Sequence, residues 1–169
     1  GAEVVAALGG LHEYARWPHA MLTDSGGFQA FSLAQNCKQT DDGFVFQSHL
    51  DGSRRMLSPE EAVRVQALLG ADIAMQLDVC PPGGAPAEAM AAACATTTAW
   101  GRRCLAAHAR HAQRPQALFG IVQGGTDVDL RRRHADELAA LEHEGRRFEG
   151  LALGGLSVGE PTEAMHETV

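Results

Sequence analysis

Residues 118–125 read Leu-Phe-Gly-Ile-Val-Gln-Gly-Gly, in which an apolar run over residues 118–122 is followed by a carboxamide and two glycines. Three similar runs, each followed by a Gly- or Pro-containing turn and a helical pattern, are 20–23 (Ala-Met-Leu-Thr), 73–77 (Ile-Ala-Met-Gln-Leu) and 151–153 (Leu-Ala-Leu). Near-continuous apolar runs are typical of parallel strands that are covered on both faces. The repeated strand–helix order therefore predicts an α/β fold with a parallel sheet and right-handed crossovers.

Start and stop signals bound the helices between these runs. Residues 58–61 (Ser-Pro-Glu-Glu) form a capping box with proline at the first helical position, and Gly70 stands where a C-terminal cap would. Carboxylates that follow Thr126 favour a helix start there. Pro86 opens an alanine-rich helix and Pro161 opens the last one. These signals predict one helix after each strand.

A longer excursion, residues 31–57, separates the first predicted strand from the second. Within it, residues 43–47 (Gly-Phe-Val-Phe-Gln) are typical of one arm of a hairpin, and Asp51-Gly52 is a turn signal. The four βα units predict either a small open doubly wound sheet or about half of a (β/α)8 barrel. We favour the partial TIM barrel, because the last helical pattern reaches the final residue without a cap.

Composition excludes several classes of protein. The 169 residues carry 14 Lys and Arg against 21 Asp and Glu, and 45% are hydrophobic, which is an ordinary globular mixture. No apolar run approaches the roughly 20 residues of a membrane span. The net charge of −7 argues against binding nucleic acid by bulk charge alone. The arginine pairs and the run 131–133 are expected on solvated helix faces. The four cysteines form no C-x-x-C pair, which favours free thiols in a reducing cytoplasm.

Polar groups follow each predicted strand directly. They are Asp24, Asp78, Gln123 and the pair Gly154-Gly155. A single aspartate at such a place is most often a helix N-cap, but parallel strands bring all four positions to one rim. Carboxylates, a carboxamide and glycine backbone together match the donor and acceptor edges of a planar heterocycle such as a purine. Phe28 is then either a stacking face for that ring or a core aromatic.

Residues 23–29 (Thr-Asp-Ser-Gly-Gly-Phe-Gln) resemble the signature of the tRNA-guanine transglycosylases, the queuine tRNA-ribosyltransferases. Further similar segments follow in the family's order: 49–53 running into 57–60, then 120–125, then 154–160. The resemblance implies a (β/α)8 barrel and a cytoplasmic pentosyltransferase of queuosine biosynthesis. Such an enzyme exchanges guanine at the wobble position of certain tRNAs for a 7-deazaguanine base.

The resemblance also implies roles for single residues. Asp24 would be the proton acceptor, Phe28 would lie against the ring, and the main chain at Gly155 would contact the exocyclic substituent. Cys80 and Val158 resemble the bacterial form, which takes 7-aminomethyl-7-deazaguanine rather than queuine. The substrate-binding positions implied are Asp24, Ser25, Gly26, Gly27, Phe28, Asp78, Cys80, Gln123, Gly155, Leu156 and Glu160. Of these, Asp78 and Gln123 would read the purine edge and Glu160 would hold the Gly155-Leu156 peptide.

Two parts of the family pattern are not found in this sequence. The nucleophilic aspartate and a zinc site of three cysteines and a histidine lie further along in the family, so no metal or other cofactor is expected within these residues. We therefore expect residues 1–169 to be one domain, an incomplete barrel from the centre of a longer enzyme, and inactive when isolated. Expected partners are tRNA and the 7-deazaguanine base, with a homodimer implied by resemblance alone and no membrane. The alternatives are a non-catalytic partner subunit of the same family that docks tRNA, and an unrelated flavodoxin-like binding module.

Overall fold

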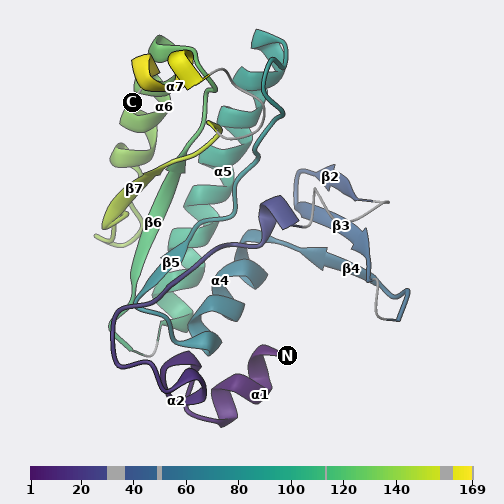
Figure 1. Cartoon of the computed structure of the whole chain (residues 1–169), viewed down its shortest axis with the longest axis vertical. Helices are drawn as coiled ribbons and strands as arrows, with labels where there is room; N and C mark the ends of the chain where they lie inside the picture. Colours follow the sequence, from purple (N-terminus) through teal and green to yellow (C-terminus); the bar gives the residue numbers. More distant parts are fainter. Residues whose placement is uncertain (30–36, 49–50, 113, 157–161, 169) are drawn as a thin grey trace.

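A sheet of four parallel strands forms the centre of the computed structural model (Figure 1), which describes all residues except 30–36, 49–50, 113, 157–161 and 169. Its strands are paired in the order β1 (Leu22–Thr23), β5 (Ile73–Met75), β6 (Ala117–Val122) and β7 (Gly150–Leu153). The predicted parallel sheet is thus confirmed, and β6 and β7 lie within one residue of their predicted bounds.

The order of the strands in the sheet follows the order in the chain. A doubly wound sheet reverses direction at a switch point and carries helices on both faces. Here there is no reversal, so right-handed crossovers place α4 (Pro59–Leu69), α5 (Ala87–His111) and α6 (Val128–Ala140) on the same face of the sheet (Figure 1). This arrangement is that of a barrel wall and confirms the partial TIM barrel.

Two strands are shorter than predicted. β1 begins two residues late and β5 ends two residues early, at Met75. The Gln76 N–H still donates to the Phe119 carbonyl of β6 at 2.9 Å, but the N–H groups of Leu77 and Val79 find partners on α5 instead of on a strand. Leu77 donates to Cys104 Sγ at 3.4 Å, and Val79 donates to Thr97 Oγ1 at 3.0 Å. Because these side chains satisfy the buried donors, strand pairing ends and the chain turns over the top of the helix.

The helix ends follow the sequence signals. Ser58 accepts a hydrogen bond from the Glu61 N–H at 3.2 Å, and Gly70 closes α4 in the left-handed conformation. The N-cap of α6 is Asp127, one residue after Thr126, and it accepts from the Leu130 N–H at 2.9 Å. Elements that the sequence reasoning did not anticipate are α1 (Ala2–Ala7) and α2 (Leu11–Ala15), while α7 (Thr162–Thr168) lies where a last helix is predicted.

The excursion after β1 contains a small antiparallel sheet of its own. Its strands are β2 (Lys38–Thr40), β3 (Gly43–Gln47) and β4 (Arg54–Leu57). β3 and β4 form the predicted hairpin around Asp51-Gly52. β2 is a further strand, and its Lys-Gln-Thr sequence carries no apolar pattern that would have marked it. This insertion projects beside the main sheet in Figure 1.

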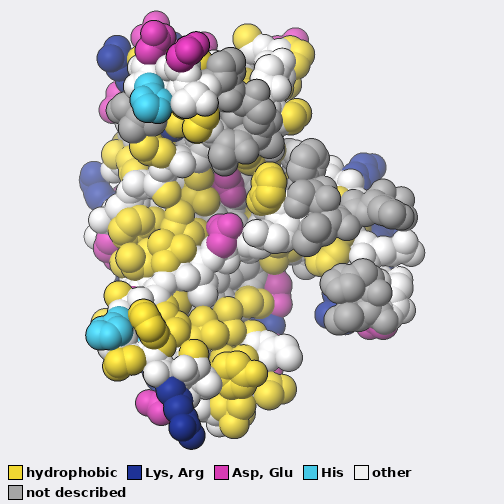
Figure 2. Space-filling model, viewed as in Figure 1, with side chains coloured by type: hydrophobic (Ala, Val, Ile, Leu, Met, Phe, Trp, Pro, Cys, Tyr) yellow, Lys and Arg dark blue, Asp and Glu magenta, His cyan; other side chains and the backbone are white. Residues whose placement is uncertain are grey.

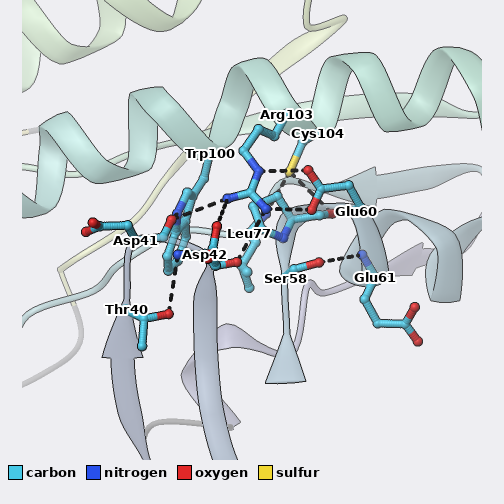
Figure 3. Close-up of polar contacts among 11 residues, drawn as sticks. Thr40, Asp41, Asp42, Ser58, Glu60, Glu61, Leu77, Trp100, Arg103 and Cys104 are labelled. Carbon is cyan, nitrogen blue, oxygen red and sulfur yellow. Dashed lines mark hydrogen bonds and ion pairs between the residues drawn. The ribbon is translucent and has the colours of Figure 1, made fainter. Parts of the chain in front are cut away.

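Side chains of α4 and α5 hold the insertion in place (Figure 3). Trp100 Nε1 donates to the Asp41 carbonyl at 2.8 Å, and the Trp100 ring meets Phe44 edge to face with centroids 5.3 Å apart. Arg103 donates to both carboxylate oxygens of Glu60, at 2.7 and 2.8 Å, and also to the Asp41 carbonyl at 3.3 Å. One arginine therefore joins both helices to the β2–β3 turn.

We expect Arg103→Ala to lower the free energy of unfolding by about 1–2 kcal/mol, because it removes a forked ion pair that is partly shielded from solvent. The hydrogen bonds from Arg103 lower the pKa of Glu60 from 4.5 to about 2. The contribution of the pair is therefore present above pH 4.5 and is lost as the pH falls toward 2. Urea denaturation between pH 2 and pH 7 measures both the loss of stability in Arg103→Ala and its dependence on pH. Arg102→Ala, an exposed neighbour on α5, is the control, and an equal effect of the two variants would contradict the assignment.

Candidate active site

The segments that follow β5 and β6 meet through a buried hydrogen bond. Gln123 Nε2 donates to Asp78 Oδ2 at 2.6 Å, and the two residues are 0% and 9% exposed. The segment after β7 packs on Gln123, because a Cβ added at Gly155 would lie 2.5 Å from Gln123 Oε1. Only glycine allows this approach at Gly155, which also has a φ of +65°. The structure thus brings together three of the four predicted strand ends.

The loop after β1 folds toward the same place. A Cβ added at Gly27 would lie 3.3 Å from the Asp78 carbonyl oxygen, so the two segments are in contact. Ser25 is buried, and its hydroxyl oxygen accepts from the Gly27 N–H at 3.3 Å. Asp24 is exposed and its Oδ1 accepts from the Ser25 N–H at 2.8 Å. Gly26, with a φ of +82°, makes the turn between Ser25 and Gly27.

A cavity of about 320 Å³ opens beside Asp78. Phe28 and Cys80 line it from the rim, while Gln39 and Phe44 line it from the insertion. Phe28 is 45% exposed, which excludes the core-aromatic alternative. Figure 2 shows acidic side chains near the centre of the face that lies between the sheet and the insertion. Sequence reasoning missed Gln39 and Phe44, since nothing in their local pattern ties the insertion to the rim.

Burial controls the acidity of Asp78. Loss of water on burial raises the pKa of this carboxyl, the hydrogen bond from Gln123 lowers it, and the negative charge of Asp24 raises it, so that the pKa is about 7 with all of these effects together. Near neutral pH the carboxyl is therefore poised between its two protonation states. Such a group can accept hydrogen bonds from a ligand or hold a proton beside it.

Gln123 is held at its side chain by Asp78 and at its backbone by helix α6. Its backbone N–H donates to His134 Nδ1 on α6 at 2.8 Å. Burial lowers the pKa of His134, which keeps the ring neutral and leaves Nδ1 free to accept. Within the described residues, Gln123 Oε1 is buried without a hydrogen-bond partner. Because such a group costs free energy, it is an acceptor that a bound ligand would satisfy.

The remaining predicted site residues have simpler surroundings. Leu156 is buried beside Gly155, and Cys80 is half-buried at the cavity wall. Glu160 and Val158 lie outside the described residues.

The prediction that residues 131–133 all lie on a solvated face is wrong for Arg131, which is 4% exposed. In a helix of 3.6 residues per turn, three consecutive residues are spread over about 200° of the circumference, so they do not share one face and their burial can differ. Arg132 and Arg133 are exposed as expected.

No group of His, Cys, Asp or Glu side chains suited to a metal ion exists in the part of the chain that the structure describes. The described residues therefore offer no ligand set for a zinc ion, and the zinc that the resemblance implies belongs to a later segment of the family pattern. The described helices include none that is both long and apolar enough to cross a bilayer.

Comparison with known proteins agrees with the motifs and the geometry. The family model described as queuine tRNA-ribosyltransferase matches residues 1–169. The chain belongs to the queuine tRNA-ribosyltransferase family. This result confirms the resemblance of its motifs.

Curated members of the queuine tRNA-ribosyltransferase family are similar over essentially the whole chain. The protein named queuine tRNA-ribosyltransferase from Sorangium cellulosum is 67% identical over 170 residues, covering 100% of this chain and 41% of that protein. Those of the same name from Symbiobacterium thermophilum and Pelotomaculum thermopropionicum are 51% and 50% identical, and the match covers 40% and 44% of their lengths. The chain thus spans about two fifths of these family members.

The pKa of Asp78 predicts an unusual pH dependence of stability. The folded state keeps this proton up to about pH 7, whereas the unfolded chain releases it near 3.8. Between these values the folded state binds more protons, so this group lowers stability as the pH rises.

We expect the unfolding free energy of the wild type, measured relative to that of Asp78→Asn, to fall by a few kcal/mol, as an order of magnitude, between pH 4.5 and pH 8. Denaturant titrations measure this difference. Asp136→Asn, at an exposed position on α6, is the control. Parallel pH curves for the wild type and Asp78→Asn would refute the assignment.

Proposed function

We propose that this chain carries the base-binding half of a tRNA-guanine transglycosylase site. The complete reaction would exchange guanine at the wobble position of tRNA for 7-aminomethyl-7-deazaguanine. The observation that carries the proposal is the buried Gln123–Asp78 hydrogen bond beside a cavity of about 320 Å³. A cavity of this size is typical of small-molecule sites, and it contains a carboxyl whose pKa burial has shifted to about 7.

Recognition of the base follows from the groups present. A guanine ring presents N–H donors at N1 and at its 2-amino group, and an acceptor at O6. Asp78 Oδ2 already accepts from Gln123, so Oδ1 and the remaining lone pairs serve the ring donors. Gln123 offers its unpaired Oε1 and the second amide proton. The half-exposed ring of Phe28 supplies the stacking face.

The substituent of the base would meet the glycine segment after β7. The main chain at Gly154 and Gly155 lies against Gln123, on the side away from β1 in the order of the sheet. An aminomethyl cation needs carbonyl acceptors, which a main chain free of Cβ atoms offers at close range. Cys80 at the cavity wall supports the bacterial form of the substrate.

Asp24 is the proton acceptor in this proposal. It is exposed at the rim, and the Ser25 N–H fixes one of its oxygens while leaving the other for the base or the tRNA. Exchange at one ribose carbon with retention needs a covalent ribosyl–carboxylate intermediate as well as this proton carrier. By the family pattern, the nucleophilic carboxylate belongs to a segment beyond these 169 residues.

Base binding tests the role of Asp78. We expect Asp78→Ala to weaken the binding of guanine to the chain by about 1.5–3 kcal/mol, or about 10- to 150-fold in Kd, because charge-assisted hydrogen bonds are lost. Isothermal titration calorimetry measures the difference. Asp136→Ala, at an exposed position, is the matched control and should bind as the wild type does. Equal affinity of wild type and Asp78→Ala would exclude this residue from the site.

The division of the site predicts binding without turnover. Incubated with radiolabelled guanine and a tRNA that has guanine at its wobble position, the chain alone is expected to incorporate no label above background. The curated Sorangium cellulosum relative serves as the positive control. Incorporation by the 169-residue chain would show that the nucleophile lies within it, and would overturn the assignment of half a site.

A further inference from the structure

His134 joins α6 to the rim at the point where β6 ends. Its ring is 1% exposed, and Nδ1 accepts the backbone N–H of Gln123 at 2.8 Å. Gln123 is the first residue beyond β6, and its N–H is bound by this ring instead of by a neighbouring strand. A helix side chain thus completes the backbone hydrogen bonding of a residue in the candidate site.

The peptide between Val122 and Gln123 is held at both of its polar groups. The Val122 carbonyl accepts an N–H from the segment after β7 at 2.9 Å, and the Gln123 N–H donates to His134. Because a trans peptide is planar, these two hydrogen bonds together fix its orientation. The chain beyond Gln123 adds little resistance to rotation, since Gly124-Gly125 follows with positive φ values. Without an acceptor at His134, this peptide keeps one of its two bonds and can turn about it.

The side chain of Gln123 has little room to compensate for such a turn. Its Nε2 donates to Asp78 Oδ2 at 2.6 Å, and a Cβ added at Gly154 would lie 2.7 Å from the same Nε2. A Cβ added at Gly155 would lie 2.5 Å from Oε1. Rotation of the Gln123 backbone therefore moves its amide away from Asp78 and redirects Oε1, the acceptor that a ligand would satisfy.

Only a neutral ring at His134 can hold this N–H. The neutral imidazole has one nitrogen that accepts and one that donates, whereas the protonated ring carries a hydrogen on both. Protonation would therefore set a donor at Nδ1 against the N–H of Gln123. Within the described residues, Nε2 is buried without a hydrogen-bond partner, so no carboxylate there binds the ring and stabilises a charge on it.

The surroundings of the ring favour its neutral form near pH 7. Burial is the largest effect and lowers the pKa of His134 from 6.5; of the charged groups, Glu137 raises it and Arg131 lowers it. Both of these lie on α6, and from α5 Thr98 donates to Glu137 Oε2 at 3.1 Å. β6 and β7 contribute no charged side chain, and Asp78 of the rim is joined to the ring through one intervening residue. The ring therefore takes up its proton on the acid side of pH 6.5.

We propose that His134 is a positioning residue whose neutral ring holds Gln123 in the orientation that binds the base, so that protonation of the ring releases Gln123 and weakens base binding in acid. This inference rests on the proposed function for the identity of the ligand. α6 covers the outer face of the sheet (Figure 1), so His134 acts on the base through Gln123 and not by contact.

The test compares two substitutions of similar size. Guanine is titrated calorimetrically between pH 8 and pH 5 into the wild-type chain, His134→Asn, His134→Leu and His166→Asn. Asparagine can present its Oδ1 where Nδ1 lies and does not titrate in this range, whereas leucine offers no acceptor. His166, an exposed histidine on α7, is the matched control because its substitution removes an imidazole that lies away from Gln123 in the sequence and in the sheet.

Two results are expected. At pH 8, His134→Leu should weaken guanine binding about five- to tenfold, because a buried N–H loses its acceptor, and His134→Asn should restore most of the affinity. Between pH 8 and pH 5, the Kd of the wild type relative to that of His134→Asn should rise about threefold or more, because only the wild-type ring takes up a proton. Protonation of Asp78 affects both proteins alike and cancels in this ratio. His166→Asn should follow the wild-type curve.

A role of His134 in folding alone predicts lower stability without these changes in affinity. If His134→Leu binds guanine as the wild type does, or if the ratio of the two Kd values is the same at pH 5 and pH 8, the proposal is wrong. Circular dichroism shows whether each variant folds, and the ratio for the wild type and His134→Asn decides the question if His134→Leu does not.

No binding of guanine by the wild type at pH 8 would refute the proposed function. In that event, NMR titration of the Asp78 carboxyl decides the claim about position, because the hydrogen bond from Gln123 lowers the pKa of Asp78. A higher pKa of Asp78 in His134→Leu than in His134→Asn supports the claim, and equal values overturn it.

Discussion

The parallel pairing of β5 with β6 is the constraint on which the candidate site depends. Its register sets Met75 opposite Phe119, so Asp78 and Gln123 leave the sheet at nearly the same height on neighbouring strands. A carboxyl buried there would be costly alone, and the 2.6 Å hydrogen bond from the amide offsets part of that cost. A shift of one residue in this pairing would turn one of the two side chains toward the helices.

Helix side chains take over where the strand pairing stops. Cys104 and Thr97 of α5 accept the backbone N–H groups of Leu77 and Val79, while His134 of α6 accepts that of Gln123. The backbone of the rim is thus satisfied from the helix side of the sheet. Its polar side chains are consequently left to face one another and the cavity, where a ligand would use them.

The sequence patterns were sufficient for the parallel sheet, for the caps at Ser58 and Gly70, and for the meeting of the strand ends. They could not show how α6 faces the rim, because an arginine run such as 131–133 normally indicates solvent and only packing shows which member is buried. They also could not connect Gln39 with Asp78, since that proximity depends on the docking of the β2–β3 turn by Arg103 and Trp100. Local patterns thus predicted the strands, the caps and the rim, whereas long-range contacts determine which arginine is buried and where the insertion lies.

The two carboxyl groups of the rim are not equivalent, and the difference comes from burial. Asp78 lies behind the loop of Gly27 and loses its hydration, while Asp24 stays exposed at the entrance. Their mutual repulsion adds to the burial effect and favours a proton on Asp78. A ligand that brings N–H donors to Asp78 removes the need for that proton, and so favours the charged form. Base binding would then release a proton from the buried carboxyl beside Asp24. The electrostatics of the rim therefore give its two carboxyl groups different properties, which supports the proposed division between a group that reads the base and a group that carries protons.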